Sequence, residues 1–241
     1  ALVVLSAAAQ APAPDPAARA AAAVKKVDGT FIRSNAAKTP DWPSYGLDYA
    51  ETRHSRLDQI NTTNVQQLGL VWSYDLESTR GIEATPLVVD GVMYVSAAWS
   101  VVHAVNAKTG ERLWTYNPKV NKGAEGFKGC CDVVNRGVAL WKGKVFVGAY
   151  DGRLIALDAA TGKEVWSKNT FEGEKGSYTI TGAPRVFKGK VIIGNGGAEY
   201  GVRGYITAYD PATGAPQWPR LVVPGDAAHP MSPYLAQGSG M

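Results

Sequence analysis

The 241-residue sequence lacks the features of a membrane or nucleic-acid-binding protein. No apolar run reaches the roughly 18 residues that a membrane-spanning helix needs, so no membrane span is predicted. Charged residues make up only 19% of the chain, and its 25 basic and 21 acidic residues form no basic stripe, which argues against a nucleic-acid partner. Because 45% of the residues are hydrophobic, the chain can still bury a core, and a wholly disordered chain is excluded.

Cysteine and histidine are also scarce. The only two cysteines, Cys130 and Cys131, are adjacent, so no disulfide framework can link distant parts of the chain. His54, His103 and His229 are isolated and lack the spacing of metal ligands, so surface or core roles are expected for them. No C-x-x-C-H motif occurs, so the sequence as given has no site for covalent attachment of haem c.

The first 40 residues differ in composition from the rest. They open on ALVVLSAAAQA, an apolar stretch followed by small residues, and small-x-small cleavage patterns end at Ala9 and Ala11. The alanine and proline bias continues to Ala23, so a low-complexity tail without a targeting role is the alternative. We expect a truncated signal peptide and leader over residues 1–40, an exported, periplasmic protein, and a fold that begins near residue 41.

An internal repeat is the strongest pattern in the sequence. The segments AVNAKTGERLW, ALDAATGKEVW and AYDPATGAPQW start at Ala104, Ala156 and Ala208, which are 52 residues apart without a gap. Each follows alternating apolar runs that are joined by short turns such as VDG or KGK, so one repeat contains about four strands. Four strands repeating at 40 to 50 residues are typical of a β-propeller blade. We therefore predict an all-β propeller rather than a sandwich of unrelated hairpins.

The T-G pair of each copy predicts a tight turn, and the tryptophan four residues later can stack on a neighbouring blade. LGLVWSYDL, at residues 68–76, predicts one isolated outer strand of a further blade. Trp99 and Trp141 are expected in blade strands, as core. Residues 41–218 have room for about three to four blades, and residues 219–241 are expected to form an irregular or truncated tail.

The pattern A-x-(D/N)-x-x-T-G-x-x-x-W resembles the tryptophan-docking motif of quinoprotein dehydrogenases. The opening segment 41–72, the Cys130-Cys131 pair and GNGGAEYGVRGYITAYD at 194–210 extend the resemblance over about residues 41–226. It is strongest to the methanol and ethanol dehydrogenases, including the quinohaemoprotein alcohol dehydrogenases. The resemblance implies the N-terminal part of an eight-bladed propeller with pyrroloquinoline quinone (PQQ) on its axis. It also implies Ca²⁺, primary alcohols as substrates and a cytochrome c as electron acceptor.

The adjacent cysteines have two interpretations. Neighbouring Cα atoms are about 3.8 Å apart, less than the usual disulfide span, so a bond between Cys130 and Cys131 would close a strained ring. From the spacing alone, two thiols in a turn are the simpler interpretation. The resemblance reverses that preference, because in the family such a ring packs flat against one face of PQQ.

PQQ carries three carboxylates and an ortho-quinone, so its pocket needs cations, hydroxyls and backbone N–H groups. By resemblance, Arg136, Glu83 in GIEATP and Thr181 in TITGAP match positions that hold the cofactor. Without that resemblance, Arg136 would be a solvated loop residue. Thr179 competes with Thr181, since it lies on the same strand face two residues away, and Thr181 is chosen because it precedes G-A-P.

The second candidate cluster is Gly-rich. By resemblance, Gly196, Gly197 and Ala198 line PQQ, and Glu199 binds Ca²⁺ through a hard carboxylate oxygen. The alternative is a Gly-rich hairpin with an exposed glutamate. A dinucleotide-binding loop is excluded, because the glycines do not fit G-x-G-x-x-G and a strand-like run follows where a helix should begin.

The catalytic aspartate of the family matches no residue here, because it belongs to blades beyond residue 218. We therefore expect no catalytic residue in this chain and no turnover by the chain alone, with haem c possible only in a further C-terminal domain. The alternative function is a non-catalytic propeller scaffold of the outer-membrane assembly type. Such a scaffold needs neither an adjacent cysteine pair nor a metal loop, and so the enzyme family is favoured.

Overall fold

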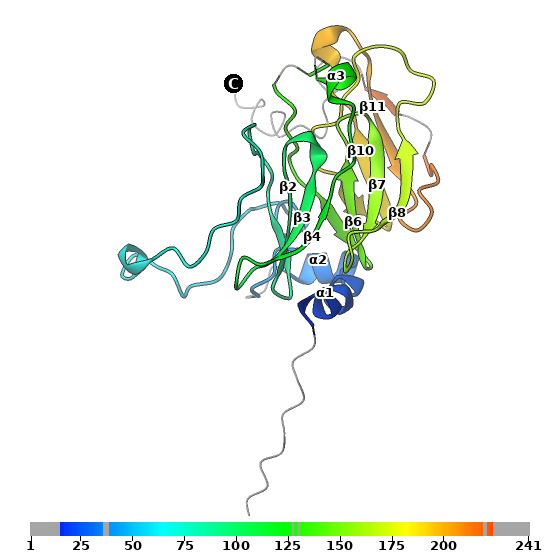
Figure 1. The fold of residues 1–241 in the computed structure, drawn as a ribbon. Helices are drawn as coiled ribbons and strands as arrows, with labels where there is room; N and C mark the ends of the chain where they lie inside the picture. The colour runs from blue at the N-terminus through cyan, green and yellow to red at the C-terminus, as the bar shows by residue number, and fades with distance from the viewer. Residues whose placement is uncertain (1–14, 36–38, 127, 130, 219–220, 224–241) are drawn as a thin grey trace, which may run out of the picture.

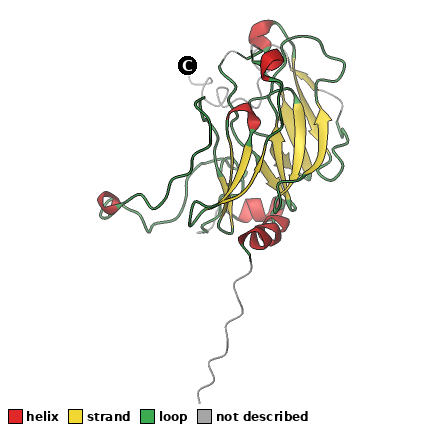
Figure 2. Ribbon diagram, in the orientation of Figure 1, coloured by secondary structure: helices red, strands yellow, loops and turns green. Residues whose placement is uncertain are grey.

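The computed structural model describes residues 15–35, 39–126, 128–129, 131–218 and 221–223. Within them, twelve short strands form three four-stranded antiparallel sheets (Figures 1 and 2). The first sheet contains β1 (Leu87–Val89), β2 (Val92–Ser96), β3 (Val102–Asn106) and β4 (Arg112–Tyr116). The second contains β5 (Ala139–Trp141), β6 (Lys144–Gly148), β7 (Arg153–Asp158) and β8 (Glu164–Asn169). The third contains β9 (Arg185–Phe187), β10 (Lys190–Gly194), β11 (Gly204–Tyr209) and β12 (Leu221–Val223).

In every sheet the strands pair in chain order, so each sheet is an up-and-down meander of four strands. The first two strands of each sheet are joined by a two-residue turn whose second residue is glycine, and both turn residues have positive φ. These turn residues are Asp90-Gly91, Lys142-Gly143 and Lys188-Gly189. Positive φ at both positions defines the type I′ turn, whose twist matches that of paired strands. The predicted VDG and KGK hairpins and the four-stranded blades are confirmed.

The repeated motif forms the turn between the third and fourth strands of a sheet. In the second sheet, Asp158 Oδ1 accepts hydrogen bonds from the backbone N–H groups of Ala160 (3.1 Å) and Thr161 (2.9 Å) and from the Thr161 hydroxyl (2.8 Å). Gly162 follows at φ 69° and donates its N–H to the Asp158 carbonyl at 2.9 Å. The aspartate and threonine of the motif therefore shape this turn, and the glycine is required by its backbone conformation.

The tryptophans of the motif dock on the next turn along the chain, as predicted. Trp114 Nε1 donates to Ala159 O at 3.1 Å, and Trp166 Nε1 donates to Pro211 O at 3.2 Å. The Trp114 ring covers Gly162 so closely that an added Cβ there would lie 2.6 Å from the ring. The motif thus links the first sheet to the second, and the second to the third.

The segment 68–76 makes the same docking contact without belonging to a sheet. Trp72 Nε1 donates to Ala107 O at 3.2 Å. Leu70 and Val71 are 87% and 84% exposed, and the segment has no strand partner among the described residues. In Figure 1 the cyan stretch around residues 55–70 loops away from the sheets, and it includes the short 3₁₀ turn η1 (Val65–Gln67). The prediction of an outer strand at residues 68–76 is therefore wrong for the described structure, although the segment's tryptophan docks as Trp114 and Trp166 do.

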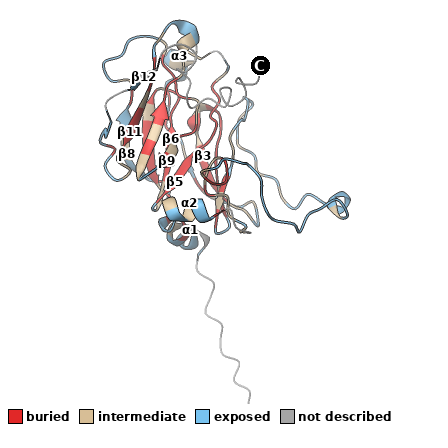
Figure 3. Cartoon of the chain, turned by 180° about the vertical axis from the view of Figure 1, so that it is seen from behind, coloured by how far each residue is buried: buried red, intermediate tan, exposed pale blue. Residues whose placement is uncertain are grey.

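The hydrophobic core lies between the sheets and is densest at the second sheet (Figure 3). The strands β6 and β7 are almost wholly buried, with Val145, Phe146 and Ile155 at 0% exposure. Trp141 is buried in β5, as expected, whereas Trp99 lies in a 3₁₀ turn, η2 (Ala98–Ser100), beyond the end of β2. The expectation of a strand residue is wrong for Trp99.

Part of the expected leader belongs to the fold. The helices α1 (Pro16–Lys25) and α2 (Gly29–Ser34) pack against the ends of the sheets (Figures 1 and 3). Val24, Val27 and Ile32 are buried in the core, and Lys142 N donates to Val27 O at 2.9 Å. The prediction that the fold begins near residue 41 is therefore corrected. Alanine bias suggested low complexity, but small residues also let a helix approach a sheet closely.

The predicted tail also starts too early. Leu221–Val223 forms β12 and pairs with β11, so the boundary at residue 218 falls inside the third sheet. Residues 224–241 lie outside the described residues, and the tail prediction there remains a prediction. None of the helices in the described part of the chain is long and apolar enough to cross a membrane.

Candidate cofactor-binding site

Three of the predicted site residues occupy equivalent places in the three sheets. Glu83, Arg136 and Thr181 each lie a few residues before the first strand of their sheet, β1, β5 and β9 respectively. Their backbones are linked side by side: Arg136 N donates to Thr181 O at 2.9 Å, and Thr85 N donates to Arg136 O at 3.3 Å. Residues separated by about 50 positions in sequence are thereby brought together at one end of the sheets.

Arg136 joins the three side chains directly. Its Nη1 donates to Thr181 Oγ1 at 2.6 Å, and its Nη2 lies 2.9 Å from Glu83 Oε2. The arginine side chain is only 8% exposed, whereas that of Glu83 is 44% exposed. A guanidinium has five N–H donors, and these two contacts use one each. Such a buried, oriented guanidinium can also bind a ligand carboxylate or carbonyl oxygen.

The Gly-rich loop lies beside this cluster. Gly196 N donates to Thr179 O at 2.7 Å, which places the loop next to the segment that ends at Thr181. Gly197 has φ 111°, and a Cβ there would collide with the Ser177 carbonyl, so only glycine fits. The following residues, Ala198–Tyr200, form the 3₁₀ turn η3, on which Glu199 is exposed.

The competing threonines have different surroundings. Thr179 is buried, and its backbone pairs with Gly196, whereas the Thr181 hydroxyl accepts the hydrogen bond from Arg136. The structure therefore places Thr181 in the charged cluster, in agreement with its position before G-A-P.

The cysteine segment approaches the same region from the second sheet. Cys130 lies outside the described residues, and Cys131 directly precedes Asp132. Tyr150, two residues beyond the end of β6, has a buried hydroxyl with no hydrogen-bond partner among the described residues. Burial raises the pKa of this hydroxyl, and nearby acidic groups, including Asp132 and Glu199, raise it further. The cysteine segment and the Gly-rich loop thus both lie near Tyr150.

Sequence reasoning expected Trp99 in a strand and did not single out Tyr150, so the aromatic pair at this place was not predicted. Trp99 packs edge-on against Tyr150, with ring centroids 5.8 Å apart. The two residues occupy the same position, after the second strand, in the first and second sheets, as the Gly-rich loop does in the third. That shared position in the repeat was the available signal, and it lies outside the eleven-residue motif.

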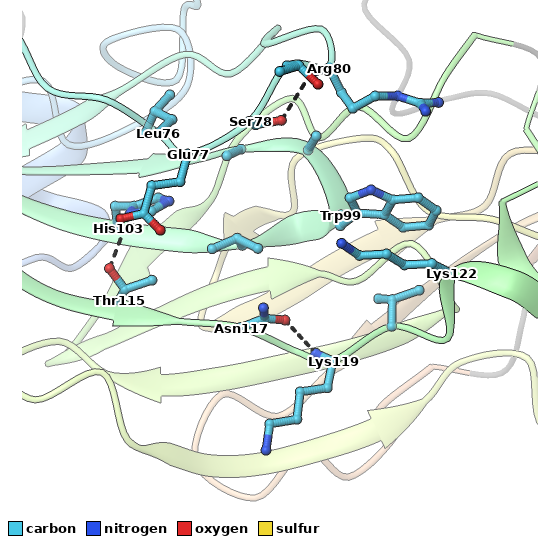
Figure 4. Close-up of a pocket in the computed structure, with 15 residues that line it drawn as sticks. Leu76, Glu77, Ser78, Arg80, Trp99, His103, Thr115, Asn117, Lys119 and Lys122 are labelled. Atoms are coloured by element: carbon cyan, nitrogen blue, oxygen red, sulfur yellow. Dashed lines mark hydrogen bonds between the residues drawn. The ribbon is translucent and has the colours of Figure 1, made fainter.

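A separate cavity of about 360 Å³ lies between residues 76–80 and the first sheet (Figure 4). The buried ring of His103 lines it. Its Nδ1 lies 3.1 Å from both the Tyr74 and Thr115 hydroxyls, and its Nε2 has no partner among the described residues. Burial lowers the pKa of His103. None of the residues predicted from the sequence to form the site lines this cavity, although Trp99 and Arg80 do.

The described residues contain no group of three or more His, Cys, Asp or Glu side chains that could bind a metal ion. Glu199 is the one residue of this part of the chain that was predicted as a metal ligand. A Ca²⁺ site needs six to eight oxygen ligands, so further ligands would have to come from elsewhere.

The repeated sheets and the forward-docking tryptophans define a propeller-type protein. A family model described as the β-propeller domain of PQQ-dependent glucose, ethanol and alcohol dehydrogenases matches residues 42–234. The chain belongs to this PQQ-dependent dehydrogenase family.

Individual relatives agree with the family. The quinohemoprotein alcohol dehydrogenase of Comamonas testosteroni is 75% identical over 215 residues, which are 89% of this chain and 30% of that protein. Its crystal structure superposes with a TM-score of 0.84, over 91% of this chain and 33% of that one. A 1-butanol dehydrogenase (cytochrome c) of Thauera butanivorans is 63% identical over 191 residues, covering 79% of this chain and 27% of the relative.

A more distant solved structure, a europium-containing methanol dehydrogenase, is 44% identical with a TM-score of 0.70, over 78% of this chain and 32% of that one. The chain thus spans about 30% of the length of the curated relatives that it matches.

Proposed function

We propose that this chain is the N-terminal part of a PQQ- and Ca²⁺-dependent alcohol dehydrogenase that oxidises primary alcohols to aldehydes. The observation that carries the proposal is the Glu83–Arg136–Thr181 cluster, in which a buried guanidinium is held between a carboxylate and a hydroxyl. The identity to quinohaemoprotein alcohol dehydrogenases supports the same assignment.

The cofactor would lie against the first strands of the three sheets. Arg136 would bind a carboxylate or quinone oxygen, with Glu83 and Thr181 fixing the orientation of its guanidinium. Gly196, Gly197 and Ala198 would line the cofactor, because small residues allow close approach of the backbone. When bound, PQQ supplies the two-electron acceptor for the alcohol.

The adjacent cysteines would form a disulfide ring against the face of the cofactor. No free cysteine occurs among the described residues, which supports this pairing. A flat ring of this kind would exclude water from one face of PQQ, as the aromatic pair Trp99 and Tyr150 beside it would also do.

Glu199 would be one ligand of a Ca²⁺ ion, with the other ligands supplied by the cofactor and by residues outside the described part. Glu199 lies on η3 and its residue is exposed. The europium in a related methanol dehydrogenase shows that a hard cation is bound in that relative, and carboxylate oxygens suit such ions.

Electrons would pass to a cytochrome c, as the name of the Thauera butanivorans relative indicates for that protein. Haem c, if present, would belong to a further domain, and we place the protein in the periplasm. The isolated chain should not turn over alcohol, because no general-base residue for the reaction is assigned in it. A non-catalytic scaffold is the alternative, and it would not need the Arg136 cluster.

The test is a titration of the purified chain with PQQ in the presence of Ca²⁺. Binding is measured by the quenching of tryptophan fluorescence. Saturable binding is expected, and Arg136→Met should weaken it about tenfold or more, because a charge-assisted contact to the cofactor is lost. Arg112→Gln is a matched control, since Arg112 pairs with Glu77 on the surface at 3.2 Å.

Equal binding by wild type and Arg136→Met, or no binding by either, would contradict the proposed site. With a primary alcohol and an artificial electron acceptor added, no sustained reduction is expected from the chain alone. Sustained turnover would refute the proposed inactivity.

A further inference from the structure

A second ion pair lies close to the Arg136 cluster and beside the cysteine segment. Arg80 Nε donates to both carboxylate oxygens of Asp132, at 2.8 and 3.0 Å, and Arg80 Nη2 also contacts Oδ1. Arg80 also lines the cavity, where Figure 4 shows its side chain extending away from Glu77 and His103. Its partner, Asp132, immediately follows Cys131 in the chain.

The two ion pairs join the same two segments. Arg80 and Glu83 lie on one segment, and their partners Asp132 and Arg136 lie on the other. The order of charge is opposite on the two segments, basic then acidic on the first and acidic then basic on the second. A slip that brought residue 80 towards residue 136 would place two arginines together. The two ion pairs therefore hold the two segments together and also favour one alignment of one segment along the other.

The backbone around Asp132 depends on the same carboxylate. Asp132 has φ 69°, a left-handed conformation that few residues other than glycine, asparagine and aspartate adopt readily. Its Oδ1 accepts a hydrogen bond from Val133 N at 2.7 Å. The hydrogen bond from Arg80 lowers the pKa of Asp132 to about 2, so the carboxylate is ionised at neutral pH. One carboxylate thus shapes the turn after Cys131 and ties that turn to Arg80.

We infer that Arg80 and Asp132 are positioning residues that hold the Cys131 segment in register with the segment carrying Glu83. This inference rests on the proposed function, because the register matters there for binding PQQ between the cysteine segment and the Arg136 cluster. Neither residue touches the cofactor in this scheme. Their effect passes through the position of Cys131 and of Glu83.

An ordinary surface ion pair would contribute little to the stability of the fold, because exposed pairs are screened by water and salt. The Arg80 and Asp132 side chains are 50% and 31% exposed, so the pair is not buried. It differs from the Arg112–Glu77 pair, which has a single contact at 3.2 Å and side chains 54% and 71% exposed. The two-oxygen geometry and the bond to Val133 N provide the orientation that the surface pair lacks.

The experiment compares the variants Arg80→Gln, Arg80→Lys and Asp132→Asn, with Arg112→Gln as the matched control. Asparagine tolerates the left-handed conformation, so Asp132→Asn removes the charge without straining the backbone. Three quantities are measured on the full chain: the Kd for PQQ in the presence of Ca²⁺, hydrogen exchange at the Val133 amide, and the melting temperature.

Arg80→Gln and Asp132→Asn should each weaken PQQ binding about three- to fivefold and speed exchange at Val133, with little change in melting temperature. Their double variant should be no worse than either single variant, because both remove one interaction. Arg80→Lys should lie between wild type and Arg80→Gln, since lysine cannot contact both oxygens in the same fork. Arg112→Gln should change none of these quantities.

The inference is overturned if Arg80→Gln binds PQQ as tightly as wild type, or if Arg112→Gln weakens binding equally. Failure of the proposed function looks different: wild type would then fail to bind PQQ, or Arg136→Met would bind as wild type does. In that case the Val133 exchange still decides whether the pair holds the segment, and unchanged exchange in Arg80→Gln would overturn it.

Discussion

The same docking contact has different surroundings at two places in this molecule. Trp114 and Trp72 both donate an indole N–H to the carbonyl at the same position of the next turn, at 3.1 and 3.2 Å. Trp114 belongs to a sheet and is buried, whereas the segment around Trp72 has no sheet and exposes Leu70 and Val71. The motif thus determines the contact, while burial and rigidity come from the sheet behind it.

The largest expected effect on the free energy of unfolding comes from replacing the glycine under each indole ring by alanine, which adds a methyl group there. Gly162→Ala should lower the free energy of unfolding by about 2–4 kcal/mol, because the residue is held at φ 69° and the Trp114 ring cannot move away. Gly110→Ala meets the Trp72 ring at a similar distance, 2.7 Å, yet should cost about 1–2 kcal/mol, mostly backbone strain. Urea unfolding of both variants measures the difference, and equal losses would contradict the comparison.

Replacing the indoles should have a smaller effect. Trp114→Phe removes the hydrogen bond to Ala159 O and part of a buried ring, and should cost about 2 kcal/mol. Trp72→Phe should cost about 0.5 kcal/mol, because its segment is largely solvated already. Denaturant midpoints of the two variants provide the measurement. A loss at Trp72 as large as that at Trp114 would show that the exposed segment is rigidly held.

The smallest expected effect is a dependence of stability on pH. It arises at His103, in the first sheet, whose ring lies next to Tyr74. Burial lowers the pKa of His103, against a smaller raising effect of Glu77, and Arg112 lowers it further. The folded state therefore binds fewer protons than the unfolded state, so stability is greatest above pH of about 6.5 and falls as the pH drops towards 5.

His103→Asn should remove this part of the pH dependence, worth under about 1 kcal/mol, while the carboxylate contribution stays. Urea unfolding at pH 7.5 and pH 5.5 for wild type and variant gives the difference. An identical pH dependence would mean that water reaches His103 and that this face of the sheet is not dry.

Much of the fold was predictable because the repeat is carried by local chemistry. The Asp158–Thr161 hydrogen bonds, the positive φ of Gly162 and the type I′ hairpins all follow from residues adjacent in sequence. Helices α1 and α2 were missed because an alanine-rich stretch has the same composition whether it packs or not. Only the spacing of the buried residues Val24 and Val27 distinguishes the two cases.

The candidate site was predictable in part, through the resemblance. Glu83, Arg136 and Thr181 do meet, and outside the eleven-residue motif the only sign of it is their similar position before the first strand of each sheet. Arg80 and Asp132 carry no motif, and their pairing depends on how two loops lie beside each other in space. Such loop-to-loop contacts are set by tertiary packing and are invisible to local patterns.

The docking bonds also have a direction. All three docking hydrogen bonds point forward along the chain, across 35 residues from Trp72 and across 45 from Trp114 and Trp166. No such bond among the described residues points back. Each sheet therefore makes its docking contact with the sheet that follows it in the chain. During synthesis, a growing chain can form these contacts one after another, in the order in which the sheets are made. A substitution that disrupts one turn would weaken the docking contact between two neighbouring sheets and leave the contact between the other two sheets intact.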